Sequence, residues 1–248
     1  MNDGRLSGKR VAVTGAARGL GRAFVLHLAG SGARVLAADV LAAELDETCA
    51  LARAAGGEAH ALELDVTSPA ALATAREVLG GLDALVNNAA VVEGLARRPF
   101  DALPDDEWDR VLEVNVKGVW LCTKAAVPLL REAGGGSIVN IASEVAFTGS
   151  PGLAHYVTSK AAVIGLTGVL ARELGPSAIR VNALAPGFIP TDAAQTMTDG
   201  AIYDTTATPL GRVGEPADLL GALSFLLSDE SAFVTGQTIL VNGGRTLR

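Results

Sequence analysis

The fold is indicated most directly by residues 11–21, which read Val11-Ala12-Val13-Thr14-Gly15-Ala16-Ala17-Arg18-Gly19-Leu20-Gly21. An apolar run here leads into closely spaced glycines and then into a helical pattern, which is the context that a dinucleotide-binding loop requires. We expect Gly15 to permit the sharp turn, Gly19 the close approach of backbone to a pyrophosphate, and Gly21 tight packing of helix on sheet. Because glycines this close together can also form an ordinary tight turn, the interpretation depends on the rest of the chain.

Beyond this loop, short β-branched runs alternate with longer Ala/Leu-rich segments, which predicts a parallel sheet covered by helices on both faces. The expected strands are 10–14, 33–38, 59–64, 82–87, 136–142, 178–184 and 237–241. The expected helices are 19–31, 41–56, 68–80, 105–133, 155–174 and 215–227.

No repeat, linker or charge run divides residues 1–248, so we predict a single α/β domain. Its expected architecture is a three-layer, doubly wound Rossmann-type fold with seven parallel strands. One connection, residues 186–214, is long and rich in Pro, Thr and Gly. Segments of this kind in compact α/β domains are usually lids or binding loops, so we expect it to contact substrate.

Composition narrows the classes of partner. The formal charge is −7 and no basic cluster is longer than Arg97-Arg98, so we expect neither nucleic acid nor an anionic membrane as partner. The two cysteines, Cys49 and Cys122, have no metal-ligand spacing, and we expect no metal and no disulfide. A polar N-terminus without room for a signal peptide, and the lack of a membrane-length apolar stretch, predict a cytoplasmic protein.

Asp39 ends the second expected strand and bears on the choice of cofactor. A carboxylate there can accept both ribose hydroxyls of an adenosine and would repel a 2′-phosphate, so the sequence predicts NAD rather than NADP. Arg18 favours the opposite choice, because a guanidinium in the loop could pair with that phosphate. We interpret Arg18 as the ion-pair partner of Asp39 or as a plane stacked on adenine, with a solvated surface arginine as the alternative.

Two further strand ends carry cofactor candidates. Asp65-Val66 closes the third strand, and Asn87-Asn88-Ala89-Ala90 closes the fourth. Ligands of doubly wound sheets bind at this edge, so Asp65 is a candidate partner of the adenine amino group, and the two alanines leave space for the adenosine.

Tyr156 and Lys160 lie four residues apart and therefore share one face of the expected helix. The charge of the lysine can favour the ionised phenol. A proton donor-acceptor beside a bound dinucleotide indicates hydride transfer between a carbinol and a nicotinamide.

These motifs, taken in order, resemble the classical branch of the short-chain dehydrogenase/reductase family over nearly the whole chain. One departure is Ala90, where the family usually has glycine. The resemblance is carried by Thr14-Gly15…Gly19-Leu20-Gly21, Asp65, Asn87-Asn88-Ala89, Asn115, Ser143, Tyr156…Lys160, Pro186-Gly187…Thr191 and Asn242-Gly243-Gly244.

The resemblance implies a catalytic tetrad. Tyr156 is then the acid/base, Lys160 lowers its pKa and holds the nicotinamide ribose, Ser143 orients the substrate oxygen, and Asn115 anchors a water that links Lys160 to solvent. It also implies that the protein is a homotetramer. The segment from Pro186 to Thr191 is then expected to surround the carboxamide of the nicotinamide. The full set of expected cofactor contacts is Gly15, Arg18, Gly19, Leu20, Gly21, Asp39, Asp65, Val66, Asn88, Ala89, Ala90, Tyr156, Lys160, Pro186, Gly187, Ile189 and Thr191.

The leading functional hypothesis is an NAD-dependent secondary-alcohol dehydrogenase or ketone reductase. Its expected pocket is mainly apolar, which favours a hydrophobic or aromatic carbinol, while Glu144 keeps hydroxysteroid, sugar and vitamin-like alcohols open. The expected substrate contacts are Val92, Glu144, Val145, Phe147, Phe188, Ala193 and Met197.

Two alternatives stay open. A 3-oxoacyl-(acyl-carrier-protein) reductase would use NADPH and need a basic patch near the pocket, for which Arg97-Arg98 is the candidate. A non-catalytic NAD-binding regulator is expected to lack a member of the tetrad, and all four are present. Enoyl reductases of the family place six residues between tyrosine and lysine, whereas three separate Tyr156 from Lys160.

Overall fold

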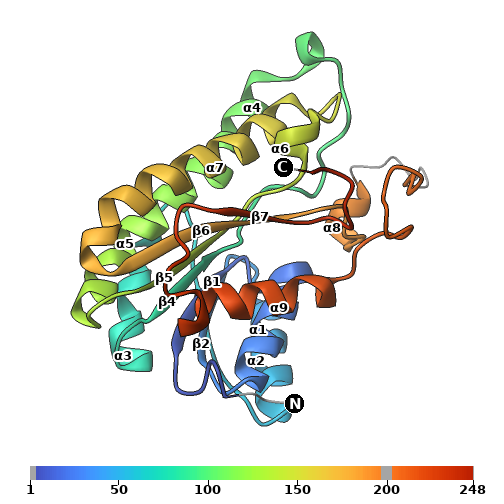
Figure 1. The fold of residues 1–248 in the computed structure, drawn as a ribbon. Coiled ribbons are helices and arrows are strands. Elements are labelled where there is room, and N and C mark those ends of the chain that lie inside the picture. The colour runs from blue at the N-terminus through green and yellow to red at the C-terminus, as the bar shows by residue number, and fades with distance from the viewer. Residues whose placement is uncertain (1–3, 197–202, 248) are drawn as a thin grey trace.

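The computed structural model of the protein describes residues 4–196 and 203–247. Its seven strands form one parallel sheet in the order β3-β2-β1-β4-β5-β6-β7, with helices on both faces (Figure 1). This confirms the predicted three-layer, doubly wound fold. The strands are β1 (Arg10–Thr14), β2 (Arg34–Asp39), β3 (Glu58–Glu63), β4 (Ala84–Asn87), β5 (Gly136–Ile141), β6 (Ile179–Pro186) and β7 (Thr238–Val241).

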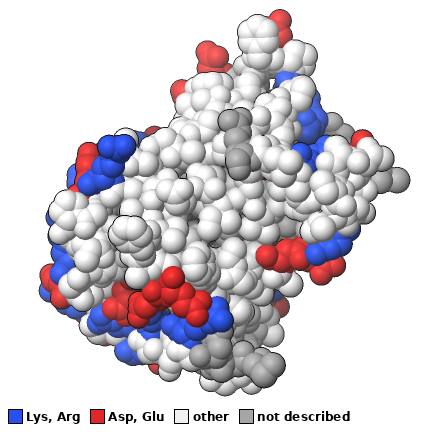
Figure 2. Space-filling view, in the orientation of Figure 1, with Lys and Arg blue, Asp and Glu red and all other residues white. Residues whose placement is uncertain are grey.

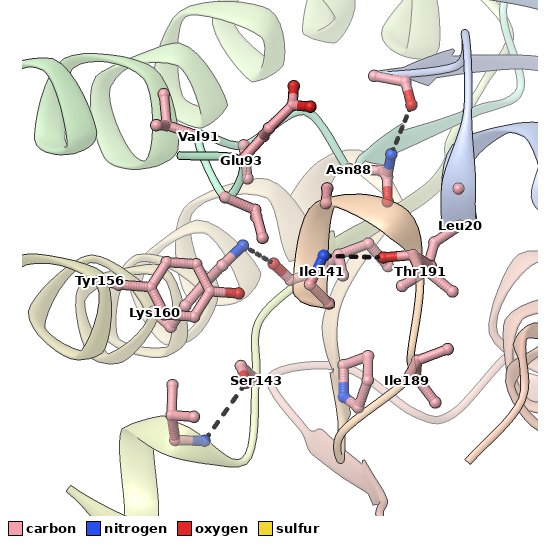
Figure 3. A pocket seen from close by; sticks show the side chains of 18 of the residues that line it. Leu20, Asn88, Val91, Glu93, Ile141, Ser143, Tyr156, Lys160, Ile189 and Thr191 are labelled. Carbon is pink, nitrogen blue, oxygen red and sulfur yellow. Dashed lines mark hydrogen bonds between the residues drawn. The ribbon is translucent and has the colours of Figure 1, made fainter. Parts of the chain in front are cut away.

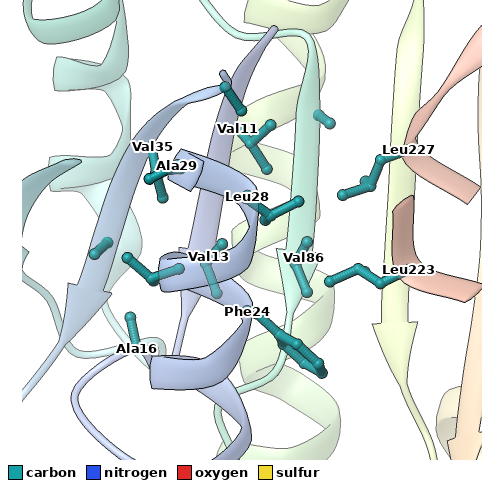
Figure 4. Close-up of a cluster of buried hydrophobic side chains, with 14 of the residues drawn as sticks. Val11, Val13, Ala16, Phe24, Leu28, Ala29, Val35, Val86, Leu223 and Leu227 are labelled. Atoms are coloured by element: carbon teal, nitrogen blue, oxygen red, sulfur yellow. The ribbon is translucent and has the colours of Figure 1, made fainter. Parts of the chain in front are cut away.

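The main helices close to their predicted positions are α1 (Gly19–Gly30), α2 (Ala42–Ala54), α7 (Ala154–Leu174) and α9 (Pro216–Leu227). The strand β1 shows how the two faces are covered. Val11 and Val13 pack in the cluster that contains Phe24 of α1, whereas Ala12, between them, packs in the cluster on the opposite face (Figure 4). This alternation buries both faces of the sheet and explains why the strands are apolar throughout.

Two predicted helices are interrupted. The segment predicted as 68–80 is a 3₁₀ turn, η1 (Pro69–Thr74), followed by the short helix α3 (Ala75–Leu79). The segment predicted as 105–133 consists of α4 (Asp105–Leu112), the π-helical turn η3 (Glu113–Lys117) and α5 (Gly118–Glu132). A π turn inserts one residue without changing the apolar character of the sequence, so the hydrophobic pattern does not reveal it. Short turns also occur in the loops, namely η2 (Phe100–Ala102), α6 (Val145–Thr148), η4 (Gly175–Ser177), α8 (Asp192–Gln195) and η6 (Asp229–Ser231).

The glycine loop joins β1 to α1 with the geometry that the sequence suggests. Gly15 has a φ of +66°, and a Cβ placed on it would lie 2.7 Å from the Cα of Ala89. A Cβ on Gly21 would lie 1.8 Å from the carbonyl oxygen of Gly15. Both positions therefore exclude any side chain, and the loop folds back tightly onto the start of α1.

Charged side chains on the face drawn in Figure 2 lie mainly around its rim, with acidic and basic groups intermixed. Within the described ranges, no helix combines the length and apolar character needed to cross a bilayer.

Candidate active site

A cavity of about 920 Å³ opens at the carboxyl-terminal edge of the sheet. Its walls come from the segments that follow β1, β2, β3, β4, β5 and β6, so the strand ends that were expected to meet do meet there. The volume lies in the range of small-molecule and cofactor sites.

Every residue expected to contact the cofactor lines this cavity. The glycine loop, the ends of β2 and β3, and the segment after β4 form one part of the wall, and the segment after β6 forms another. The residues brought together are Gly15, Arg18, Gly19, Leu20, Gly21, Asp39, Asp65, Val66, Asn88, Ala89, Ala90, Tyr156, Lys160, Pro186, Gly187, Ile189 and Thr191.

Asn88 supports the glycine loop from the neighbouring strand. Its Nδ2 donates hydrogen bonds to the carbonyl oxygens of Thr14 and Gly15, at 3.0 and 2.9 Å. Its side chain therefore fixes the backbone of the loop. This supporting contact does not follow from the sequence spacing, because it joins the ends of β1 and β4, which are neighbours only in the folded sheet.

Asp39 is held with its carboxylate at the cavity. One oxygen accepts a hydrogen bond from the backbone N–H of Ala17 at 2.9 Å, and the other accepts one from the N–H of Leu41 at 3.1 Å. These bonds orient the carboxylate at the end of β2, where a ribose hydroxyl could donate to its remaining lone pairs.

Arg18 does not pair with Asp39, contrary to one of the sequence interpretations. Its guanidinium forms an ion pair with Glu93, in the segment after β4. The side chains are 44% and 52% exposed, so solvent screens the pair. The hydrogen bond that Arg18 donates to the carboxylate of Glu93 is the largest cause of a raised pKa for Arg18, and the charge of Asp39 adds to it.

Asp65 closes a turn at the end of β3. Its Oδ1 accepts hydrogen bonds from the backbone N–H and the hydroxyl of Thr67, both at 2.8 Å. The carboxylate thus has a fixed direction at the cavity wall, and its contact with adenine stays a prediction.

Ser143, Tyr156 and Lys160 lie together in the wall of the cavity (Figure 3). All three are buried. Nζ of Lys160 donates to the carbonyl oxygen of Ile141 at 2.8 Å, and Oγ of Ser143 accepts from the N–H of Val145 at 3.3 Å. The side chain of Ser143 favours the ionised form of the Tyr156 phenol.

The pKa values of the pair depart from the sequence expectation. Burial raises the pKa of Tyr156 to about 12, and its hydrogen bond with Ser143 offsets only part of that rise. Burial also lowers the pKa of Lys160 to about 8. Burial therefore dominates the pKa of the phenol, and the lowering expected from Lys160, whose Nζ lies 5.7 Å from the ring centroid, stays a prediction.

Asn115, the fourth member of the expected tetrad, does not line the cavity. It lies in η3, fully buried, where Oδ1 accepts from the N–H of Val91 at 2.7 Å and Nδ2 donates to Oγ of Ser159 at 3.2 Å. Since Ser159 precedes Lys160 in α7, the amide fixes α7 against the segment after β4. Its role as the anchor of a water stays a prediction.

Five of the seven expected substrate contacts line the cavity: Val92, Glu144, Val145, Phe188 and Ala193. Phe147 does not, because the helical turn α6 directs it into the cluster of Val119, Ala142 and Val163. Met197 lies outside the described residues.

The sequence analysis missed Tyr203 and Arg245, which both line the cavity. The ring of Tyr203 stacks on Phe188, with centroids 4.5 Å apart and an interplanar angle of 11°. Its hydroxyl donates to Oε1 of Glu144 at 3.1 Å, and the guanidinium of Arg245 lies 4.7 Å from its centroid. No local pattern marks these residues, since they come from an irregular loop and from the C-terminal segment.

The carboxylate of Glu144 is thus occupied by groups of the protein itself. Its second oxygen accepts from Nδ2 of Asn242 at 3.1 Å. The expectation that Glu144 binds a polar group of substrate is not tested by these contacts, but they give it a structural role between the 186–214 segment and the C-terminal segment.

Comparison with known proteins shows which family has this arrangement. Residues 15–246 match the family model described as Enoyl-(Acyl carrier protein) reductase. The 3-oxoacyl-(acyl-carrier-protein) reductase FabG of Thermotoga maritima is 40% identical over 246 residues, covering 97% of this chain and 98% of that protein. A short-chain type dehydrogenase/reductase from Mycobacterium marinum is 35% identical with a TM-score of 0.92, covering 99% of this chain and 98% of the other. The chain belongs to the short-chain dehydrogenase/reductase family.

A third relative carries ligands. A 7α-hydroxysteroid dehydrogenase, solved in complex with NADH and 7-oxoglycochenodeoxycholic acid, is 34% identical with a TM-score of 0.89, covering 100% of this chain and 98% of that one. As a short-chain dehydrogenase/reductase, the protein is an oxidoreductase that acts on CH–OH groups.

Proposed function

We propose that the protein is an NAD(H)-dependent dehydrogenase that interconverts a secondary alcohol and its ketone. The observation that carries the proposal is the burial of Ser143, Tyr156 and Lys160 in the same cavity as the glycine loop and Asp39. A proton-transfer group and the edge of the sheet proposed to bind the dinucleotide share one cavity, which is what hydride transfer coupled to proton transfer requires.

The residues fit a nicotinamide dinucleotide at the carboxyl edge of the sheet. Gly15 and Gly21 leave no room for side chains, and the backbone at the start of α1 offers N–H groups to a pyrophosphate. Asp39 would hold the adenosine ribose, and Pro186 to Thr191 would surround the nicotinamide. When bound, the cofactor supplies or accepts the hydride.

The chain's own groups handle the proton. With a pKa of about 12, the phenol of Tyr156 is protonated at neutral pH, so it can donate to the oxygen of a ketone as negative charge develops there. In the oxidation direction the same oxygen accepts the proton of the alcohol. Lys160, mostly protonated below pH 8, supplies the positive charge that favours the phenolate. Ser143 would donate to the substrate oxygen.

The preference for NAD is supported by the carboxylate of Asp39, which faces the cavity and would repel a 2′-phosphate. The related 7α-hydroxysteroid dehydrogenase was solved with NADH. A preference for NADPH in binding titrations of the wild-type protein would contradict this assignment.

A flat apolar carbinol is the substrate class that we propose. The wall contains Val92 and Val145, and the stacked rings of Phe188 and Tyr203 present an aromatic surface. We further propose that residues 186–214 form the substrate-binding loop, since they contribute Phe188, Tyr203 and Ala207 to the cavity.

The alternative function is 3-oxoacyl-(acyl-carrier-protein) reduction with NADPH. It is supported by the similarity to FabG of Thermotoga maritima and by Arg97, which lines the cavity and could meet an acidic carrier. The second arginine of that cluster, Arg98, is instead paired with Glu107 at 2.8 Å.

We also propose a homotetramer. An apolar groove between α4, α5 and α7 includes Val116, Trp120 and Leu166, and Trp120 is 44% exposed. Light scattering after size-exclusion chromatography checks the assembly, and a monomer at micromolar concentration would contradict it.

The deciding experiment is a screen of NAD⁺ reduction against aryl, steroid, sugar and aliphatic secondary alcohols, with 3-oxoacyl thioesters and NADPH in the reverse direction. We expect turnover with apolar carbinols and NAD⁺. Turnover confined to the thioesters with NADPH would favour the alternative, and no turnover with any member would contradict both.

A further inference from the structure

Arg18 and Glu93 face each other across the cofactor end of the cavity. Arg18 is the N-cap of α1, and Glu93 follows β4, whose neighbour in the sheet is β1. Both side chains line the cavity, and their guanidinium and carboxylate form an ion pair (Glu93 is labelled in Figure 3).

If Asp39 holds the adenosine ribose as proposed, a 2′-phosphate would lie near Arg18, because both residues line the same part of the cavity. The backbone N–H of Ala17, the residue before Arg18, donates a hydrogen bond to the carboxylate of Asp39, which would face the adenosine ribose. The negative charge of Asp39 also helps to raise the pKa of Arg18. An arginine here has the fork of N–H donors that binds phosphate best. The next arginine along α1, Arg22, is engaged with Glu47 at 2.6 Å and with Thr48 at 2.8 Å.

We propose that Glu93 is a specificity residue that holds Arg18 and thereby withholds its charge from the 2′-phosphate of NADP(H). The inference rests on the proposed function, since it concerns how the same site distinguishes the two dinucleotides. Asp39 repels the phosphate directly, whereas Glu93 removes the cation that would attract it. The repulsion by Asp39 and the loss of attraction caused by Glu93 contribute separately to the difference between the affinities for NAD(H) and NADP(H).

The position of Glu93 is stabilised by the segment that contains it. The N–H of Gly94 donates to Oγ1 of Thr196 at 3.2 Å, next to the short helix α8. The turn carrying Glu93 is therefore attached to the 186–214 loop. Because the ion pair is half exposed, its contribution is modest, and replacing Glu93 should shift the affinity ratio by roughly fivefold rather than by orders of magnitude.

The test is a fluorescence titration of NADH and NADPH with the full-length protein, which reports binding independently of turnover. In Glu93→Gln we expect the affinity for NADPH to rise about fivefold while that for NADH changes by less than about twofold. Glu132→Gln is the matched control, because it removes a similarly exposed carboxylate, paired with Arg76, from the C-terminal end of α5. It should leave both affinities unchanged.

Losing a negative charge could by itself favour NADPH, so the experiment includes Arg18→Gln and the double variant. We expect the gain from Glu93→Gln to disappear in the Arg18→Gln background. An equal gain in both backgrounds, or no gain in either, would overturn the inference. A wild-type protein that prefers NADPH would overturn only the proposed NAD preference, whereas binding of neither dinucleotide would overturn the proposed function and this inference together.

Discussion

Nζ of Lys160 donates a hydrogen bond of 2.8 Å to the carbonyl oxygen of Ile141, the last residue of β5. The bond ties α7 to the carboxyl edge of the sheet and holds the ammonium 5.7 Å from the ring centroid of Tyr156. The same burial that fixes this geometry disfavours the charge, and the pKa of Lys160 falls from 10.5 to about 8. Burying the Lys160 ammonium therefore lowers the stability of the fold, while it keeps the ammonium beside the group proposed to transfer the proton.

Lys160 makes stability depend on pH in a defined window. Between pH 8 and 10.5 the unfolded chain binds more protons than the folded protein, so raising the pH stabilises the fold, whereas below pH 8 the penalty is complete. We expect the free energy of unfolding of wild type to rise relative to that of Lys160→Met by about 1–2 kcal/mol between pH 7.5 and 9.5. The raised pKa of Tyr156 affects the pH dependence of the unfolding free energy only above pH 10, where raising the pH lowers stability.

Urea unfolding at both pH values measures this difference. Lys124→Met, at an exposed position of α5, serves as the control and should show no such change. A gap between wild type and Lys160→Met that is constant with pH would contradict a lowered lysine pKa.

Replacing Tyr156 with Phe removes the proton-transfer group and keeps the ring in its buried position. We expect turnover to fall by about 10²–10⁴-fold, the usual contribution of general acid–base catalysis. NADH binding, followed by fluorescence, should stay within about twofold of wild type, because the hydroxyl is the only group lost. Near-normal turnover would refute the assigned role.

Tyr203→Phe tests the contact between the 186–214 loop and Glu144. The stacked ring on Phe188 is retained, while the hydrogen bond to the carboxylate is lost. Because hydrogen bonds to charged groups contribute about 1.5–3 kcal/mol, we expect kcat/KM for the alcohol to fall by roughly tenfold or more. An effect on NADH affinity as large as that on kcat/KM would show that the contact does not act on substrate.

Asp39→Ala should relax the preference for NAD by removing the charge that repels a 2′-phosphate. The substitution also removes the acceptor of the Ala17 and Leu41 N–H groups, so Asp39→Asn is the comparison that keeps an acceptor oxygen. We expect both variants to lower the ratio of kcat/KM with NAD⁺ to kcat/KM with NADP⁺ by about tenfold or more. A ratio unchanged in both would exclude Asp39 as a determinant.

Gly21→Ala tests the packing of the loop. The added methyl would lie 1.8 Å from the carbonyl oxygen of Gly15, so backbone must move. We expect a loss of about 1–3 kcal/mol in unfolding free energy, together with weaker NADH binding. Gly165→Ala, where a methyl meets open space in α7, should be neutral or slightly stabilising.

Much of the fold was predictable because its signals are local. Alternating apolar runs mark strands and helices, and the order of the motifs from Gly15 to Thr191 places them at one edge of a parallel sheet. The four-residue spacing of Tyr156 and Lys160 likewise puts them on one helix face whatever surrounds them. The sequence by itself therefore determined the architecture and most of the residues that line the cavity.

Contacts between distant segments were decided only by the tertiary structure. Arg18 pairs with Glu93 rather than Asp39, Phe147 turns into the core, and Tyr203 reaches Glu144, and each outcome depends on which strand ends are neighbours. The direction of the Tyr156 pKa shift has the same origin, because desolvation is the summed effect of all the atoms that exclude water from the site. The sequence determines which chemical groups are present. The packing of the folded chain determines which partner each group contacts and how far it is exposed to solvent.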